Sequence, residues 1–224
     1  MASYKLNIAT VKGCPPVKEL AKALEDYGLP DDEEFGVLNC SATPESVFGT
    51  IVRKVQQSVQ SLDAEAREVT ASSIEKVQVY PFGCRPAGKA LELYAGSMSG
   101  IEQMGAFIGS NLGFATVVEP IELDIVAALD KLAKNTERYQ LRSVRVSDYA
   151  HNSFVSGPYA PKFLDSEHGQ DFLEEHAELL TAANVRFAGA MGRVNVRLSP
   201  TACFGYSCHE EDRPVVQSIL RKLV

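Results

Sequence analysis

The sequence predicts an α+β or α/β protein, in which a mixed, largely antiparallel sheet carries flanking helices. Two patterns lead to this prediction. Residues 193–198 (RVNVRL) alternate strictly between polar and apolar side chains, which places Val194, Val196 and Leu198 on one face of a strand. The first 62 residues instead show the order strand, helix, strand, helix, a βαβα segment that builds a sheet with helices packed on it.

The N-terminal elements follow from hydrophobic periodicity. Residues 4–11 predict a strand, and apolar residues repeat at helical spacing from Val17 to Tyr27. Gly28 then stands where a helix commonly ends, because glycine adopts the left-handed conformation that this position requires. Residues 35–40 predict the second strand.

A second helix is predicted from Thr43 to Leu62. Thr43 resembles an N-cap and Pro44 a first helical residue. The apolar residues at helical spacing are Phe48, Ile51, Val52, Val55, Val59 and Leu62. The polar stretch 63–73 loses this pattern, so we expect residues 1–62 and 74–224 to be two domains, or parts of one continuous domain.

The remaining chain is rich in predicted strands. They cover residues 74–82, 90–96, 117–123, 140–149, 159–164 and two or three strands within 185–208. Helices are predicted over residues 100–112, 124–135, 166–183 and from about 212 onward. Gly105 and Gly109, four residues apart, predict close packing of their helix on the sheet.

Composition limits the classes of function. The chain has 224 residues, 45% of them hydrophobic and 23% charged, as expected of a globular protein. Its net charge of −7 argues against a surface coated with phosphate-binding residues, although a local basic patch is compatible with it. Apolar runs are too short to cross a membrane, and five scattered cysteines favour a reducing compartment. We therefore expect a cytoplasmic protein without membrane contact.

The best candidate for a nucleophile is Cys14, which lies between a predicted strand and a predicted helix. A helix N-terminus lowers the pKa of a nearby thiol. The order strand, Cys-Pro-Pro, helix resembles the redox site of thioredoxin-like proteins, but Val17 stands where their second cysteine is expected. We favour the alternative that Cys14 has no redox role and is a small residue that fills the turn before the helix. Residues 13–16 (GCPP) and 83–86 (GCRP) look alike, an echo that we interpret as chance.

The sequence predicts no metal site and no cofactor. Cys203, Cys208 and His209 supply at most three ligands, and no second cluster completes a tetrahedral site. His176 falls on an apolar helix face, which is typical of a core histidine. Phosphate-binding glycine loops and nucleophile elbows are missing from the sequence.

Arginines on strands are the second candidate site. A positive sheet surface is expected to contain Arg142, Arg145, Arg186, Arg193 and Arg197. Such a surface tracks the backbone of a nucleic acid, and Tyr139, Tyr149 and Tyr159 are candidates for base stacking. The alternative is a solvated sheet face whose arginines pair with nearby acids.

These observations give three functional hypotheses. The first is a soluble, intracellular binding or regulatory protein that associates with a protein partner or forms a homodimer, without catalysis of its own. The second is a nucleic-acid-binding module that uses the strand arginines. The third is a cysteine-dependent enzyme or monothiol redox protein that uses Cys14. A continuous basic face would favour the second, and a base beside Cys14 in a concave pocket the third.

Overall fold

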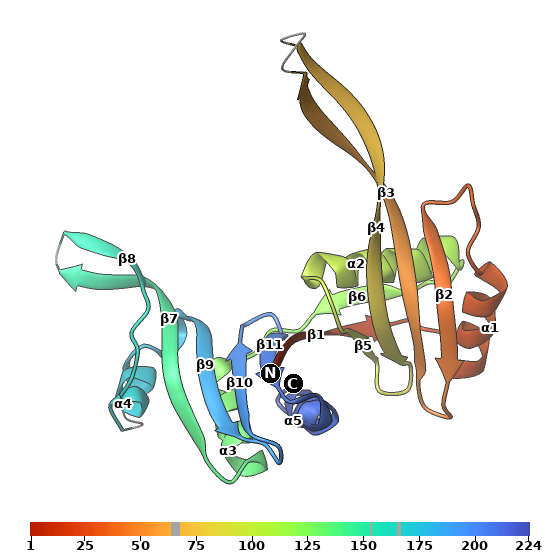
Figure 1. Cartoon of the computed structure of the whole chain (residues 1–224). Coiled ribbons are helices and arrows are strands. Elements are labelled where there is room, and N and C mark those ends of the chain that lie inside the picture. Colours follow the sequence, from red (N-terminus) through yellow and green to blue (C-terminus); the bar gives the residue numbers. More distant parts are fainter. Residues whose placement is uncertain (64–67, 153, 165–166) are drawn as a thin grey trace. The chain divides into compact units, whose positions relative to one another are not determined.

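The computed structural model describes residues 1–63, 68–152, 154–164 and 167–224 (Figure 1). The described residues form five α-helices and eleven strands, a mixed and strand-rich α+β fold. Contacts divide the chain into two compact units. Unit 1 consists of Met1–Thr10, Tyr94–Ile101 and Glu119–Val224, and unit 2 of Val11–Leu93 and Glu102–Val118. These bounds differ from the division at residues 63–73 that the sequence suggests.

Unit 1 is an antiparallel sheet with helices on one face. Its strands follow the order β1-β11-β10-β9-β7-β8. They are β1 (Ala2–Lys12, of which residues 2–10 belong to this unit), β7 (Tyr139–Asn152), β8 (Val155–Tyr159), β9 (Leu180–Ala188), β10 (Arg193–Leu198) and β11 (Cys203–Cys208). The helices are α3 (Ile125–Asn135), α4 (Glu167–Glu175) and α5 (Arg213–Arg221), with short 3-10 turns at Ala177–Leu179 and Glu210–Asp212.

The core of unit 1 lies between this sheet and its helices. Apolar side chains of α3, α4 and α5 pack in one cluster with Val194, Val196 and Leu198 of β10. The alternation predicted for residues 193–198 is confirmed, because these three side chains are buried while Arg193, Asn195 and Arg197 are not. The C-terminal helix α5 covers this face, as its apolar spacing predicts. The opposite face of the sheet is polar.

Unit 2 contains the antiparallel strands β2 to β5 and the helices that pack on them. The strands are β2 (Phe35–Ala42), β3 (Val47–Asp63), β4 (Glu68–Arg85) and β5 (Ala90–Leu93), followed in the chain by β6 (Val117–Pro120). The helices are α1 (Val17–Tyr27), α2 (Met98–Ala106, of which residues 102–106 belong to this unit) and a π-helical turn, η1 (Phe107–Asn111). β3 and β4 continue as a two-stranded arm beyond their pairing with β2 and β5 (Figure 1).

The helix predicted for residues 43–62 is wrong, and with it the second helix of the βαβα segment. The segment forms β3, which pairs along its length with β4. The signal at Thr43 was misleading because its side-chain oxygen does accept the Ser46 N–H, at 3.1 Å. The Thr43 N–H in turn donates to the Ser46 carbonyl at 2.8 Å, so the contact closes a hairpin turn between β2 and β3.

One further helix is shorter than predicted, and the packing predicted for another is confirmed. The helix predicted for 166–183 ends at Glu175, because residues from Leu180 onward pair as β9 with β7 and β10. Close packing at Gly105 is confirmed, since a Cβ there would lie 2.3 Å from Cγ2 of Val118. This face of α2 is therefore covered by its own chain.

Within the described residues, no helix has the length and apolar character needed to cross a membrane.

Candidate nucleic-acid interface

Two rows of polar side chains cross the uncovered face of the sheet in unit 1. Strand register places Lys5 of β1, Gly205 of β11, Arg197 of β10, Asn184 of β9 and Ser143 of β7 side by side. The neighbouring row, in the same strand order, contains Ser3, Ser207, Asn195, Arg186 and Gln140. Directly paired residues on antiparallel strands point to the same face, so each row is a continuous strip of side chains.

Hydrogen bonds fix the second row. Nε of Arg186 donates to Oδ1 of Asn195 at 2.9 Å, and Nδ2 of Asn195 donates to Oγ of Ser207 at 3.2 Å. These hydrogen bonds orient the Arg186 guanidinium and, among the described residues, use one of its five donor hydrogens. In the first row, Asn184 donates to Oγ of Ser143 at 2.9 Å. The half-buried Arg186 is therefore held in place by its neighbours and keeps donors for a ligand.

A groove of about 710 Å³ runs over these rows. Four cationic side chains line it: Lys5, Arg142, Arg186 and Arg197. The remaining lining is neutral, with no aspartate or glutamate among the residues described there. A groove lined by charges of one sign concentrates the potential and attracts ligands of opposite charge.

Two smaller hollows extend the basic face toward β8. One, of about 410 Å³, contains Arg145, Lys162 and Arg197, and the other, of about 310 Å³, contains Arg145 and Arg197. Neither is lined by an acidic residue among those described. Arg197 borders the groove and both hollows, so the positive surface continues from β1 to the connection after β8.

The structure brings together four of the five arginines that the sequence singled out. Arg142, Arg186 and Arg197 line the groove, and Arg145 lines the two smaller hollows. Arg193, at the start of β10, lies on the same face but lines none of them. Within the described part of the chain, none of the five pairs with a carboxylate. We call the surface formed by the groove and the two hollows the arginine face.

Sequence reasoning missed Lys5 and Gly205. Lys5 comes from the opposite end of the chain and reaches the arginine face only because β1 pairs with β11. Alternation with the buried Leu6 could have placed it on the polar side of a strand, but not beside Arg197. Gly205 lies between these two cations in the first row, where its missing side chain leaves the floor of the groove open.

Two of the three tyrosines considered for base stacking, Tyr139 and Tyr149, pack against the core, whereas Tyr159 lines the larger of the two hollows. Tyr149 stacks on Tyr159, with ring centroids 4.6 Å apart, and also meets Phe172 of α4. Tyr139 pairs with the buried Phe187 and packs against the core. The Tyr139 and Tyr149 rings are therefore occupied by packing, whereas Tyr159 is exposed and borders the arginine face.

The cysteines and histidines take different positions from those a metal site would need. Cys203 and Cys208 point to opposite faces of β11, because five residues separate them and alternate residues are buried. His176 packs between aromatic rings, 4.4 Å from the Phe172 centroid and 5.2 Å from that of Tyr149. Among the described residues, no three His, Cys, Asp or Glu side chains gather closely enough to hold a metal ion.

Cys14 has a thiol partner that spacing did not predict. Its Sγ lies 3.4 Å from Sγ of Cys84, seventy residues along the chain. The hydrogen bond from Cys84 lowers the pKa of Cys14, against the opposing effect of burial. The same contact, followed by burial, raises the pKa of Cys84. None of the hollows described above is lined by Cys14.

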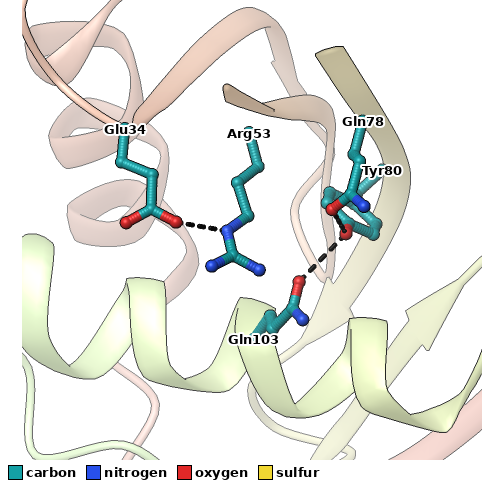
Figure 2. Close-up of polar contacts among 5 residues, drawn as sticks. All are labelled: Glu34, Arg53, Gln78, Tyr80 and Gln103. Carbon is teal, nitrogen blue, oxygen red and sulfur yellow. Dashed lines mark hydrogen bonds and ion pairs between the residues drawn. The ribbon is translucent and has the colours of Figure 1, made fainter. Parts of the chain in front are cut away.

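A polar cluster in unit 2 serves to join elements (Figure 2). Arg53 of β3 forms an ion pair with Glu34, and its guanidinium lies 5.7 Å from the centroid of the Phe35 ring. The Tyr80 hydroxyl lies 2.6 Å from the side-chain oxygen of Gln78 and 2.9 Å from that of Gln103 in α2. These contacts join β3 to the start of β2 and β4 to α2. Arg53 is paired with a carboxylate and is not available to an anionic ligand.

Comparisons with known proteins do not assign this chain to a family. No protein-family model matches this chain, and no curated protein matches it at a significant level.

Proposed function

We propose that unit 1 binds nucleic acid through its phosphate backbone, on the arginine face. One observation carries the proposal: Lys5, Arg142, Arg186 and Arg197 line one groove without an acidic neighbour in its described lining. The chain as a whole has a net charge of −7, so the clustering on one surface of cations without a carboxylate partner among the described residues is not a consequence of composition. Such clustering is the electrostatic signature of a surface that binds phosphates.

The dimensions of the face fit a chain of phosphates better than a single one. β1 and β7 are four strand steps apart. At about 4.8 Å per step, Lys5 and Arg142 are separated by about 19 Å. This distance corresponds to about five to six nucleotides at the duplex rise of ~3.4 Å. A ligand with several successive phosphates therefore contacts cations along the whole groove.

The chemistry of the face favours contacts with the backbone over contacts with bases. Arg186 is held by Asn195 with its terminal amino groups free of the hydrogen bonds described here, a geometry suited to bidentate contact with phosphate oxygens. Tyr139 and Tyr149 pack against the core, and the ring of Tyr159, which borders one hollow, is already stacked on Tyr149. We therefore expect binding with little dependence on base sequence.

The test is direct binding at low salt. Fluorescence anisotropy is measured with a labelled oligodeoxythymidylate and with a labelled duplex of equal length. Saturable binding to at least one of them is the expected result. Undetectable binding to both retires the proposal.

A steric variant tests whether binding requires the groove itself or only the positive charge around it. Gly205→Leu fills the groove without changing net charge, and it is tolerated because the nearest atom to a Cβ there is Cβ of Arg197, at 4.0 Å. We expect at least tenfold weaker binding with an unchanged thermal midpoint. The matched control is Gly157→Leu in β8, where a Cβ meets nothing within 4 Å. Equal affinity of both variants and the wild type would contradict a site in the groove.

A second candidate function is association with a protein partner or a second copy of the chain. It is supported by exposed apolar side chains on β3 and β4, all but Val79 on the arm: Leu62, Val69, Ile74, Val77 and Val79. Exposed apolar groups that gather on one element are typical of interaction sites. For self-association, light scattering after size exclusion would give a mass above 24.4 kDa that Val77→Lys returns to the monomer value. A monomeric wild-type protein would contradict the homodimer hypothesis.

A further inference from the structure

We propose that Cys14 and Cys84 form a peroxide-sensitive dithiol that closes to an intramolecular disulfide. Both residues belong to unit 2, so this modification site does not depend on the arginine face. Their sulfurs lie 3.4 Å apart as free thiols. A bonded pair is about 2.05 Å apart, so closure requires a movement of the sulfurs of a little over 1 Å.

The backbone holds Cys14 in place. Gly13 adopts a φ of +67°, and a Cβ at this position would lie 2.0 Å from the carbonyl oxygen of Ala115. Only glycine fits there, because any side chain would collide with backbone. On the other side, the buried Pro15 and then Pro16 lead into α1. Cys14 is therefore fixed between a close backbone contact and a helix, which keeps its thiol directed at Cys84.

Cys84 is fixed by the sheet. It pairs with Val47 of β3 on one side and with Leu91 of β5 on the other. Its side chain is fully buried, whereas that of Cys14 is partly exposed. The two thiols thus have different roles. Cys14 meets solvent and the oxidant, and Cys84 lies behind it as the resolving thiol.

The chemistry runs in two balanced steps with hydrogen peroxide as the oxidant. The Cys14 thiolate attacks one peroxide oxygen, the O–O bond breaks, and the departing hydroxide takes a proton to leave as water. Cys14 is then a sulfenic acid. The Cys84 sulfur attacks the Cys14 sulfur, the S–O bond breaks, and the hydroxyl group leaves as water with the Cys84 proton. The hydrogen bond between the thiols favours the first step, because it stabilises the Cys14 thiolate.

Closure of this bond joins residues seventy positions apart and encloses α1, β2, β3 and most of β4. A covalent link across a long loop restricts the unfolded chain more than the folded one. We therefore expect the oxidised protein to unfold at a higher temperature than the reduced protein.

The experiment exposes the reduced protein to a small excess of hydrogen peroxide, followed by alkylation in denaturant and intact-mass analysis. The number of alkylated thiols per chain is expected to fall from five to three. Peptide mapping without reductant is expected to recover a 14–84 linkage. In Cys14→Ser, all four remaining thiols should stay alkylatable. In Cys84→Ser, dimedone should trap a sulfenic acid on Cys14.

Cys40→Ser is the matched control, because it removes a partly exposed cysteine of unit 2 whose Sγ contacts the Ala21 carbonyl instead of a thiol. This variant should still lose two thiols on oxidation. If Cys84→Ser does not fold, Cys14→Ser, which alters a partly exposed residue, still decides the question. Five alkylatable thiols after peroxide, or a disulfide between other cysteines, would overturn the proposal and leave the nucleic-acid proposal untouched.

Discussion

Removal of Arg197 should change how binding to nucleic acid depends on salt. Each phosphate neutralised by a cation releases counterions, so log K falls with log salt by about 0.7–0.9 per contact. Four cations line the groove. If each meets a phosphate, the wild-type slope is about −2.8 to −3.6. Arg197→Ala removes one contact and should flatten it by about 0.7–0.9.

The control comes from the same strand. Arg193→Ala makes the same change of charge on the same face, but Arg193 lines neither the groove nor the hollows. Its slope should stay close to that of the wild type. Between 50 and 200 mM salt, the loss of affinity caused by Arg197→Ala should shrink by about threefold, which follows from a slope difference of 0.8.

The assay is anisotropy titration of a labelled oligodeoxythymidylate at four or more salt concentrations, with protein stability checked for each variant. Equal slopes for Arg197→Ala and the wild type would refute the reasoning. Equal flattening by both substitutions would show that binding follows total charge and not the groove.

Three further predictions concern stability and thiol chemistry. Leu198→Ala should lower the free energy of unfolding by about 2–5 kcal/mol in denaturant melts, because Leu198 is fully buried; a loss near zero would contradict its place in the core. Asp212→Ala should cost about 1–3 kcal/mol in the same melts, because the buried carboxylate accepts the Met191 N–H and its removal leaves that donor unsatisfied; an unchanged midpoint would show that water replaces the carboxylate. Alkylation of Cys14 should rise at lower pH than that of Cys40, because the pKa of Cys14 is lowered and burial raises that of Cys40. Site-resolved rates in which Cys40 reacts first would reverse this assignment.

Elements with a buried face were predictable from sequence because burial imposes a period. Strand β10 shows this most clearly, since Val194, Val196 and Leu198 must all reach the core of unit 1. α1 was predictable for the same reason, with Leu20 and Leu24 buried on one face and Gly28 at its end with a φ of +57°.

β3 was not predictable by the same means because part of it has no face to bury. Beyond Arg53, it pairs only with β4 and extends as an arm, so alternation is not enforced there. Its apolar residues then matched a helical period by accident. β-branched residues such as Val47, Ile51 and Val52 favour a strand, and this propensity was the better signal.

The candidate site was predictable only in part because it combines local and distant contacts. Alternation placed Arg186 and Arg197 on the polar face of a hairpin, where they lie in the structure. Lys5 joins them through a strand pairing between the two ends of the chain, which no local pattern reveals. The contact between Cys14 and Cys84 is of the same kind: the similar tetrapeptides around them do not indicate that their thiols meet.

The most direct test of the central claim is a map of arginine reactivity with and without nucleic acid. Phenylglyoxal modifies accessible arginines, and mass spectrometry locates the adducts. With a saturating oligodeoxythymidylate, Arg142, Arg186 and Arg197 should be protected, because phosphates occupy the groove that they line. Arg193, outside the groove, should react as before. Equal modification of all four with and without the oligonucleotide, or protection of Arg193 alone, would contradict binding on the arginine face.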